Sequence, residues 1–404
     1  MDVELVYSPA MAGYDLGPGH PLKPARFALA VELMEAYGLV PPGTAGDGRA
    51  TRAAVARAGV GGPSGADGAL RVVAPSAATD VQLLRAHDPR YVATVRSAGA
   101  QSERFFPPRA GLGGDDTPVF PRMHEAAALV AGAAVRAVDD VMGGTVTRAL
   151  SVAGGLHHAH RDRAAGFCVY NDCAVGIAHA LAERPDLRVL YVDIDAHHGD
   201  GVQAAFWDDP RVLTISVHET GFALYPGTGF ARERGGPTAR GSAANVAMPP
   251  DATDACYRLA FDEAVAPLAR RFAPGLVVAQ CGADAHHSDP LTSLGLTLPG
   301  YRWLVRAIVA LADELCAGRL VAFGGGGYSW EHVVPRAWTA LAAELAGAAP
   351  ADGLPQAWRD RVRSVTGAEP PLGLSEDRFD TGGAAEARLL ADTREAVADL
   401  MRET

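Results

Sequence analysis

The sequence predicts a three-layer α/β protein in which a parallel sheet lies between helices. Three observations support this fold class: short apolar runs alternate with longer helical patterns, most runs are apolar throughout, and polar clusters follow four of them. Continuously apolar strands are typical of a parallel sheet that is covered on both faces. The alternation of strands and helices along the chain favours the same arrangement.

Seven short apolar runs are the predicted strands. They span residues 3–8, 71–75, 149–154, 188–194, 211–218, 275–282 and 319–325. Helical periodicity between them predicts helices at 122–142, 253–272 and 299–316. The chain shows no internal repeat, and residues 1–350 are expected to form a single domain.

Two segments lack this pattern. Residues 41–69 are rich in Gly, Ala and Pro, which predicts a mobile surface insertion with a short helix at 49–58. Residues 351–404 are expected to form a C-terminal extension, irregular over 351–381 and ending in an amphipathic helix near 384–402. That helix would pack on the surface or contribute to an oligomer, and the oligomeric state stays open.

The bulk composition limits the class of protein. The chain has 404 residues, a formal net charge of −11 and five cysteines without a C-x-x-C pair. An acidic chain argues against a general nucleic-acid-binding surface, although it would attract a basic protein. The cysteine pattern, the lack of a signal-peptide pattern and the lack of a long apolar run predict a cytoplasmic protein without membrane contact.

Four polar segments follow predicted strands, at the edge where open α/β sheets bind ligands. They are "GGLHHAH", "DIDAHHGDG", "GADAHHSDP" and "GGGGYSW". Because the carboxyl ends of parallel strands meet at one edge of a sheet, we expect these segments to form one site.

The second and third segments supply a candidate metal centre. Asp195 and His197 are two residues apart at a strand end and can point the same way, and Asp284 can approach from a neighbouring strand. Two carboxylates and one imidazole leave positions open for substrate, as catalytic Zn²⁺ requires, and Fe²⁺, Co²⁺ or Mn²⁺ would also accept them. A solvated turn would explain one aspartate, but the combined set favours a metal. His286 and His287 are expected to line the rim.

The first segment supplies candidate acid–base groups. His157 and His158 are adjacent, and an imidazole can take a proton from an attacking water and return one to a leaving amine. Each histidine needs a carboxylate to orient it, and Asp193 and Asp200 can serve. In the fourth segment, four glycines precede Tyr328 without the Lys and Ser/Thr of a phosphate-binding loop. The Tyr328 hydroxyl could stabilise an oxyanion.

The same segments resemble the zinc-dependent, class I-like histone deacetylases, and within them the bacterial acetoin-utilisation deacetylases. The matching stretches include "GHPLKPARFALAVELMEAYGL", "AGGLHHAHRDRAAGFCVYND", "YVDIDAHHGDGVQAAF", "YPGTG", "CGADAHHSDPL" and "FGGGGYSW", in the order of the family from about residue 5 to 345. The resemblance implies the arginase/deacetylase fold, with an eight-stranded parallel sheet flanked by helices. The resemblance implies that Asp195, His197 and Asp284 are zinc ligands and that Tyr328 is an electrophilic tyrosine. It also implies that His157 and His158 are the paired histidines, with Asp193 behind the first and Asp200 behind the second.

The resemblance also implies substrate contacts. Gly166, Phe167 and Tyr225 would form the acyl-lysine tunnel, where most family members have a phenylalanine in place of Tyr225. Leu291 would lie at the rim, and Arg26 would line the exit for acetate. Asp116, in "GGDDTPVF" at 113–120, would accept hydrogen bonds from two backbone N–H groups of a peptide substrate, although composition alone fits a solvated turn.

The family also binds potassium. The resemblance implies one K⁺ at Asp193, Asp195, His197 and Ser216, and a second held by backbone carbonyls around Phe206.

The expected reaction is hydrolysis of acetyl-lysine in proteins to lysine and acetate. The acetoin-utilisation resemblance implies acetyl-CoA synthetase as a partner, and the physiological substrate and acyl-chain preference stay open. An acetylpolyamine amidohydrolase would share the metal chemistry, whereas arginase-like ureohydrolysis would need further acidic ligands that "GGLHHAH" lacks. A catalytically dead acyl-lysine binding module would be expected to have lost a ligand, a dyad histidine or the tyrosine, and all are present.

Overall fold

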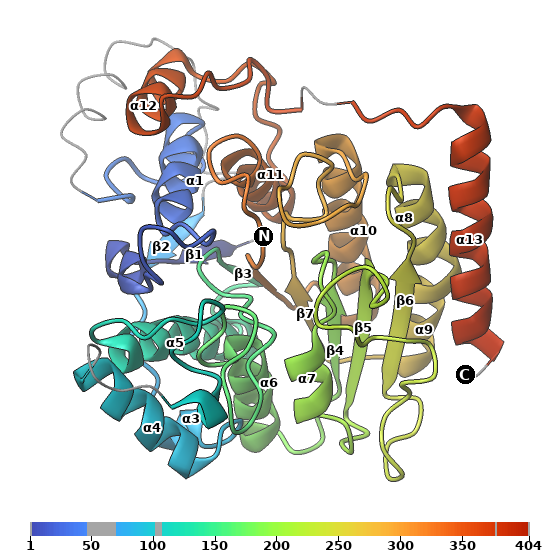
Figure 1. The fold of residues 1–404 in the computed structure, drawn as a ribbon, viewed down its shortest axis with the longest axis horizontal. Coiled ribbons are helices and arrows are strands. Elements are labelled where there is room, and N and C mark those ends of the chain that lie inside the picture. Colours follow the sequence, from blue (N-terminus) through green and yellow to red (C-terminus); the bar gives the residue numbers. More distant parts are fainter. Residues whose placement is uncertain (1, 47–69, 102–106, 376–377, 403–404) are drawn as a thin grey trace.

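The computed structural model describes residues 2–46, 70–101, 107–375 and 378–402. These residues form one eight-stranded parallel sheet with helices packed around it (Figure 1), which confirms the predicted fold class. The strands are β1 Val3–Val6, β2 Arg71–Val73, β3 Arg148–Ser151, β4 Val189–Asp193, β5 Val212–Glu219, β6 Ala243–Met248, β7 Leu276–Gln280 and β8 Leu320–Phe323.

The seven predicted strands are present, and β6 is the one that the sequence reasoning missed. Its sequence, "AANVAM", is short of large apolar residues and carries Asn245 in the middle. Asn245 is buried, and its side-chain Nδ2 donates to Gln203 Oε1 at 2.7 Å, so a buried polar group interrupts the apolar run.

The helices cover the sheet in two groups. They are α1 Ala25–Ala36, α3 Asp80–Leu83, α4 Pro89–Ala100, α5 Met123–Met142, α6 Asp172–Glu183, α7 Asp200–Ala205, α8 Asp254–Ala260, α9 Ala266–Phe272, α10 Leu298–Cys316, α11 Val334–Ala346, α12 Gln356–Thr366 and α13 Gly383–Arg402. One group contains α5 and α6, and the other contains α1, α10 and α11 (Figure 1). The predicted helices at 122–142 and 299–316 are confirmed as α5 and α10, and that at 253–272 as α8 and α9 joined by a π-helical turn.

The C-terminal extension contains one more helix than expected. The prediction of irregular structure over 351–381 is wrong for α12, whose arginine-rich sequence buries only Trp358 and Val362 and therefore carries a weak helical pattern. Trp358 Nε1 donates to the carbonyl of Leu29 on α1 at 2.9 Å. The predicted terminal helix is confirmed as α13, which packs along β6 and α8 (Figure 1). The expected helix at 49–58 lies outside the described residues.

The order of strands brings the four polar segments together. The sheet runs β2-β1-β3-β8-β7-β4-β5-β6, so β3, β8, β7 and β4 are consecutive neighbours although their chain positions are far apart. The pairing aligns Ser151 with Phe323, Phe323 with Gln280, and Gln280 with Asp193, close to the carboxyl end of each strand. The loops that follow these four strands therefore start from adjacent points at one edge of the sheet.

Two further expectations concern the chain as a whole. All five cysteines lie in the described residues, and they are buried and free. No helix in the described part of the chain is long and apolar enough to cross a membrane.

Candidate active site

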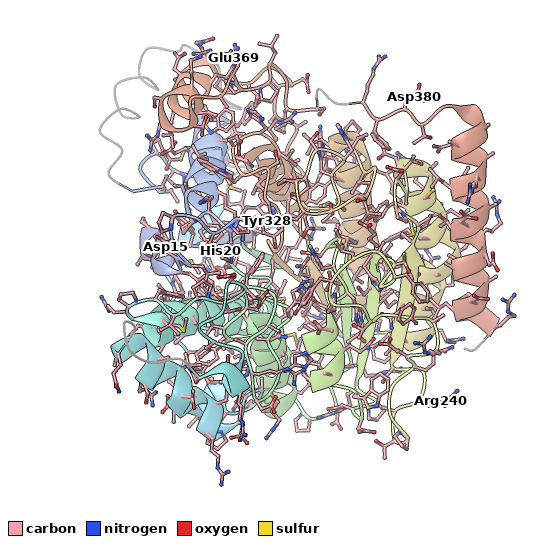
Figure 2. The ribbon with its side chains drawn as sticks, viewed as in Figure 1. Asp15, His20, Arg240, Tyr328, Glu369 and Asp380 are labelled. Atoms are coloured by element: carbon pink, nitrogen blue, oxygen red, sulfur yellow. The ribbon has the colours of Figure 1, made fainter. Side chains whose placement is uncertain are left out.

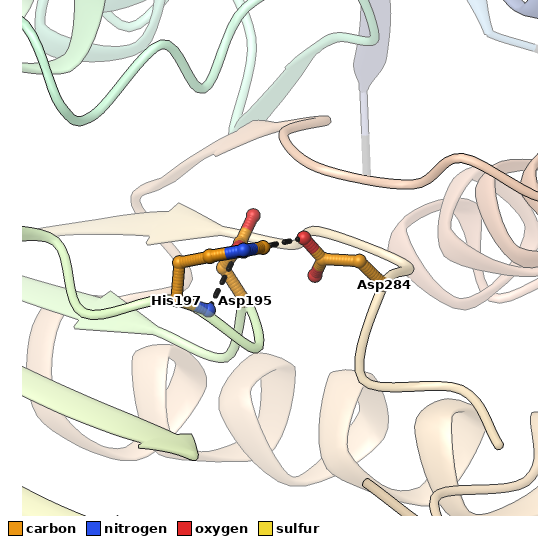
Figure 3. Close-up of side chains that lie close together, drawn as sticks. All are labelled: Asp195, His197 and Asp284. Carbon is orange, nitrogen blue, oxygen red and sulfur yellow. Dashed lines mark hydrogen bonds and ion pairs between the residues drawn. The ribbon is translucent and has the colours of Figure 1, made fainter. Parts of the chain in front are cut away.

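Three side chains form a buried cluster of potential metal ligands. Asp195 and His197 follow β4, and Asp284 reaches them from the loop after β7 (Figure 3). His197 Nδ1 lies 3.1 Å from Asp195 Oδ1 and 3.0 Å from Asp284 Oδ2. One ligand atom from each residue lies within 4.8 Å of the others, and all three residues are buried.

The charges of this cluster fit a divalent cation. Burial alone would lower the pKa of His197, but its hydrogen bonds to the Asp195 and Asp284 carboxylates, which accept them, raise that pKa to about 10. Burial and the neighbouring charge of Asp195 raise the pKa of Asp284 to about 7. Two carboxylates that face one imidazole in a buried position favour a positive charge between them, and a proton and a metal ion compete for that place.

Hydrogen bonds from neighbouring groups hold the carboxylates of Asp195 and Asp284 in place. Asp195 Oδ2 accepts hydrogen bonds from Gln280 Nε2 and from the Gly326 backbone N–H, both at 2.7 Å. Asp284 Oδ1 accepts from the N–H of Ala196 at 2.9 Å. A Cβ atom at Gly326 would lie 1.9 Å from Asp284 Oδ2, so only glycine fits there. These contacts orient the carboxylates, as outer hydrogen bonds do in metal sites.

Two histidine–aspartate pairs lie beside the cluster. His157 Nδ1 is 2.8 Å from Asp193 Oδ2, and His158 Nδ1 is 2.7 Å from Asp200 Oδ1. The Nε2 atoms of the two rings face each other at 3.1 Å. The second oxygen of Asp200 is 3.1 Å from Nε2 of His160. The structure thus brings together each histidine with the aspartate that the sequence analysis assigned to it.

The two histidines have opposite proton affinities. Burial lowers the pKa of His157, but the charges of Asp193 and Asp195 outweigh burial and raise that pKa to about 9. Burial and the nearby charge of His157 lower the pKa of His158 to about 4, against the effect of Asp200. In this arrangement His158 is neutral and can accept a proton, while His157 can carry one. A metal cation on the ligands would weaken the attraction that raises the pKa of His157.

A narrow cavity of about 20 Å³ connects these groups. Its shape depends on Gly166, where a Cβ atom would lie 2.3 Å from the His158 ring. The next residue, Phe167, has a left-handed backbone with a φ of 69°. The residues that line the cavity are Leu22, Arg26, Gly155, Leu156, His157, His158, Gly166, Phe167, Cys168, Asp195, His197, Gly325, Gly326 and Tyr328.

Aromatic rings lie in and beside this cavity. The ring of Phe167 contacts those of His20 and Tyr328, with centroid distances of 4.3 and 5.7 Å. His20 and Tyr328 are labelled near the middle of the view in Figure 2. Tyr225 places its ring 5.2 Å from that of His158 and stays 46% exposed. Burial, followed by the charge of Asp284, raises the pKa of Tyr328 well above its usual range, so its hydroxyl stays protonated.

Two predicted rim residues are exposed, and a third prediction needs a correction. Asp116 is exposed and Leu291 is 38% exposed, as rim positions require. His286 is buried rather than on the rim, because it stacks on His287, which in turn stacks on Phe379 of the C-terminal extension. Neither histidine belongs to the cluster of potential ligands among the described residues.

The predicted potassium residues lie at and just after the end of β4 and, for Ser216, within β5. Ser216 pairs with Asp193 in the strand register, and Ser216 Oγ is 2.8 Å from Nδ1 of His218. Phe206 ends α7. The positions of these residues do not test whether an ion binds there.

Sequence reasoning missed three residues that support the site. Gln280 ends an otherwise apolar strand, and a polar residue at that position is a signal that could have identified it. Tyr14 accepts a hydrogen bond from the N–H of Val169 at 2.9 Å and donates one to the carbonyl of Phe167 at 2.7 Å. Asp289 binds the backbone of Tyr328. The partners of Tyr14 and Asp289 are backbone groups far away in the chain, which no local pattern indicates.

The fold and this constellation define a metal-dependent hydrolase with the arginase/deacetylase architecture. Comparison with known families agrees: the histone deacetylase domain matches residues 20–345. The chain belongs to the histone deacetylase family, and it is a hydrolytic deacetylase.

Individual relatives give a closer setting. The acetoin utilization protein AcuC of Bacillus subtilis (strain 168) is 37% identical over 360 residues, which cover 88% of this chain and 84% of the relative. AcuC of Staphylococcus xylosus is 37% identical over 310 residues, covering 76% and 80%. A crystal structure of an HDAC homolog from Aquifex aeolicus superposes with a TM-score of 0.80 at 26% identity, covering 98% of this chain and all of that one. A structure of an HDAC homolog complexed with SAHA gives a TM-score of 0.81 at 27% identity, with the same coverage.

Proposed function

We propose that the protein is a zinc-dependent lysine deacetylase that hydrolyses acetyl-lysine in protein substrates to lysine and acetate. The observation that carries this proposal is the convergence of a three-ligand cluster, two histidine–aspartate pairs and a tyrosine on one cavity. A divalent cation on Asp195, His197 and Asp284 would act as a Lewis acid toward the scissile carbonyl.

The side chains of this protein supply the proton transfers. His158 is neutral, with Nδ1 turned to Asp200, and therefore its Nε2 can take a proton from the attacking water. An imidazolium then protonates the leaving lysine amine, and because the two rings are in contact they titrate as a pair. The Tyr328 hydroxyl donates a hydrogen bond to the oxyanion that forms on the substrate.

Arg26 fits the role of a group that attracts the acetate product. Arg26 is 1% exposed and lines the same cavity as Asp195 and His197. Nη1 donates to the carbonyl of Gly327 at 2.9 Å, while Nε has no hydrogen-bond partner among the described residues. A buried cation with a free N–H group is a suitable neighbour for a carboxylate product.

The proposal extends to ions, partners and place of action. Potassium would bind at Asp193, Asp195, His197 and Ser216, and around Phe206. The substrates would be acetylated cytoplasmic proteins of acetate or acetoin metabolism, with acetyl-CoA synthetase as the first to test. The names of the AcuC relatives support a role in acetoin metabolism.

Asp116 provides the test of substrate class. Its exposed carboxylate can accept hydrogen bonds from two backbone N–H groups, which a peptide offers and an acetylpolyamine lacks. Asp116→Ala should lower kcat/KM for acetyl-lysine peptides roughly tenfold to a hundredfold, since a hydrogen bond to a charged group contributes about 1.5–3 kcal/mol. A small acetyl-lysine analogue without flanking amides should be unaffected.

The measurement is a panel of acetyl-lysine peptides, the small analogue and acetylpolyamines on the zinc-loaded protein. Asp115→Ala is the matched control, because Asp115 is the adjacent exposed carboxylate. Equal losses on peptide and analogue would exclude the clamp. A wild-type preference for acetylpolyamines would replace the protein substrate with a polyamine.

A further inference from the structure

One peptide bond in the glycine-rich loop is held on both sides by buried, oppositely charged side chains. The bond joins Gly327 to Tyr328. Its carbonyl accepts a hydrogen bond from Arg26 Nη1 at 2.9 Å, and its N–H donates to Asp289 Oδ2 at 2.7 Å. Arg26 is 1% exposed and Asp289 is 6% exposed, so water screens neither contact effectively.

This loop needs such a restraint. Gly325 and Gly327 have φ angles of 134° and 142°, which residues with side chains rarely adopt. A run of glycines has many accessible backbone conformations, and fixing it has a large entropic cost. Yet the hydroxyl of the following Tyr328 must lie at one place beside the reacting carbonyl, because small misplacements of catalytic groups reduce rates strongly.

The other contacts of Asp289 join this loop to the metal-site loop. Oδ2 also accepts from the N–H of Ser329 at 3.4 Å, and Oδ1 accepts from the N–H of Leu291 at 3.0 Å. Asp289 lies on the same loop as Asp284, one of the three potential ligands. One carboxylate therefore sets the position of the Tyr328 backbone relative to the segment that carries a metal ligand and a rim residue.

We propose that Asp289 is a positioning residue of the deacetylase reaction, which fixes the Tyr328 hydroxyl over the reacting carbonyl by binding the Tyr328 N–H. This inference rests on the proposed role of Tyr328 as oxyanion donor. Both carboxylate oxygens of Asp289 accept from backbone N–H groups, so its expected effect on the reaction is exerted through the loop that carries Tyr328.

The expected loss appears in kcat. Removing an oxyanion donor costs about 10²–10³ in turnover, and this is the expected result for Tyr328→Phe. Asp289→Ala frees the backbone N–H of Tyr328 and should lower kcat by about 10², with little change in KM for a small acetyl-lysine substrate. Asp289→Asn keeps an oxygen that can accept from the Tyr328 N–H, and it should retain more activity than the alanine variant.

A double-mutant cycle separates positioning from general structural damage. Wild type, Asp289→Ala, Tyr328→Phe and the double variant are compared in kcat, with bound zinc and thermal midpoint measured on the same samples. We expect Asp289→Ala to cost about 10² in the wild-type background and less than about threefold in the Tyr328→Phe background, with the zinc content unchanged.

Each other outcome is informative. Equal losses in both backgrounds, loss of zinc or an unchanged kcat for Asp289→Ala would overturn the inference. A Tyr328→Phe variant with wild-type turnover would instead overturn the proposed function of the tyrosine. If Asp289→Ala is not recovered as folded protein, Asp289→Asn replaces it in the double-mutant cycle. Equal losses of kcat from Asp289→Asn in the wild-type and Tyr328→Phe backgrounds would then overturn the inference.

Discussion

At the level of single residues, the charged neighbours and the burial of each histidine of the site determine its pKa. His197 lies between two ligand carboxylates, His157 faces Asp193, and His158 faces Asp200. In the proposed mechanism, a histidine is therefore a ligand, a proton carrier or a base according to its partners. The division follows from the general rule that opposite charges stabilise a protonated imidazole and burial opposes it.

His158 is the residue whose loss should be most damaging to proton transfer. His158→Ala should lower kcat by about 10²–10⁴, the usual contribution of a general base, since its Nε2 is the basic atom that faces the cavity. The measurement is acetate release from an acetyl-lysine peptide at saturating concentration. Zinc content is the control, because His158 is not in the ligand cluster. Turnover within a factor of about two of wild type would show that another group is the base.

Sequence reasoning found the residues of the site that occur in short, recognisable patterns. Asp195 and His197 share a strand end, and the His157–His158 pair is adjacent in the chain. Gln280 was not found, although a polar residue at the end of an apolar strand is a signal for it. Asp289 was not found, because it binds a backbone group that folding brings near from another segment. Pattern spacing reports neighbours along one element, and it carries no information on such contacts.

At the level of elements, loops that lie outside the site hold its loops in place. His87, in the loop after α3, donates from Nδ1 to the carbonyl of His160 at 3.0 Å and accepts at Nε2 from the N–H of Asn171 at 3.0 Å. Asn171 Nδ2 in turn donates to the carbonyls of His157 and Ala159, each at 3.0 Å. A neutral imidazole is the form that can both donate and accept, so this network requires His87 to be uncharged.

His87 should therefore make the protein sensitive to mild acid. Burial lowers the pKa of His87 from 6.5 to about 4. Between pH 6.5 and pH 4, His87 is therefore protonated in the unfolded chain and neutral in the native state. The contribution of neutral His87 to the free energy of unfolding is fully present above pH 6.5. It is lost as the pH falls toward 4, by up to about 3 kcal/mol. Denaturant unfolding of wild type and His87→Asn at pH 7 and pH 5 measures this. The variant should lose less stability than wild type over this interval, and equal losses would exclude the role of His87.

The elements that were missed have a common physical cause. β6 contains a buried polar residue with a hydrogen-bond partner, and α12 buries only two side chains. Both therefore lack the long apolar pattern from which strands and helices were predicted. The long elements α5 and α10 bury many residues on one face, and their boundaries were predicted to within one residue.

At the level of the whole molecule, the strand order makes the site possible. β3 and β4 follow each other along the chain, but in the sheet β8 and β7 lie between them. The loops after these four strands therefore meet at the middle of the sheet. The fold class was predictable from the alternation of elements and the eight strands from the family resemblance. The order of strands comes from long-range pairing, which residue patterns do not encode.

The C-terminal helix should stabilise this sheet by covering its edge. β6 is an edge strand, and α13 packs along it with Thr393, Val397 and Leu400 buried. Arg234 Nη1 also donates to the carbonyl of Leu400 at 3.2 Å. Deletion of residues 383–404 should lower the thermal midpoint and cause self-association. The deletion exposes the β6 edge and the apolar side chains beneath α13, and such surfaces associate with other molecules.

Thermal unfolding and light scattering measure this effect. Arg388→Ala, at an exposed position of the same helix, is the control and should behave like wild type. A truncated protein with an unchanged midpoint and unchanged mass would show that α13 is dispensable for the sheet.

The most direct test of the central claim is acetate release from an acetyl-lysine peptide during zinc titration of the chelator-stripped protein. Asp195, His197 and Asp284 form the one cluster of this kind among the described residues, so activity should be absent without metal and should reach its maximum at one equivalent of zinc. Asp284→Asn should bind zinc weakly and stay inactive over the same titration. Full turnover by protein verified to contain no metal would contradict the account.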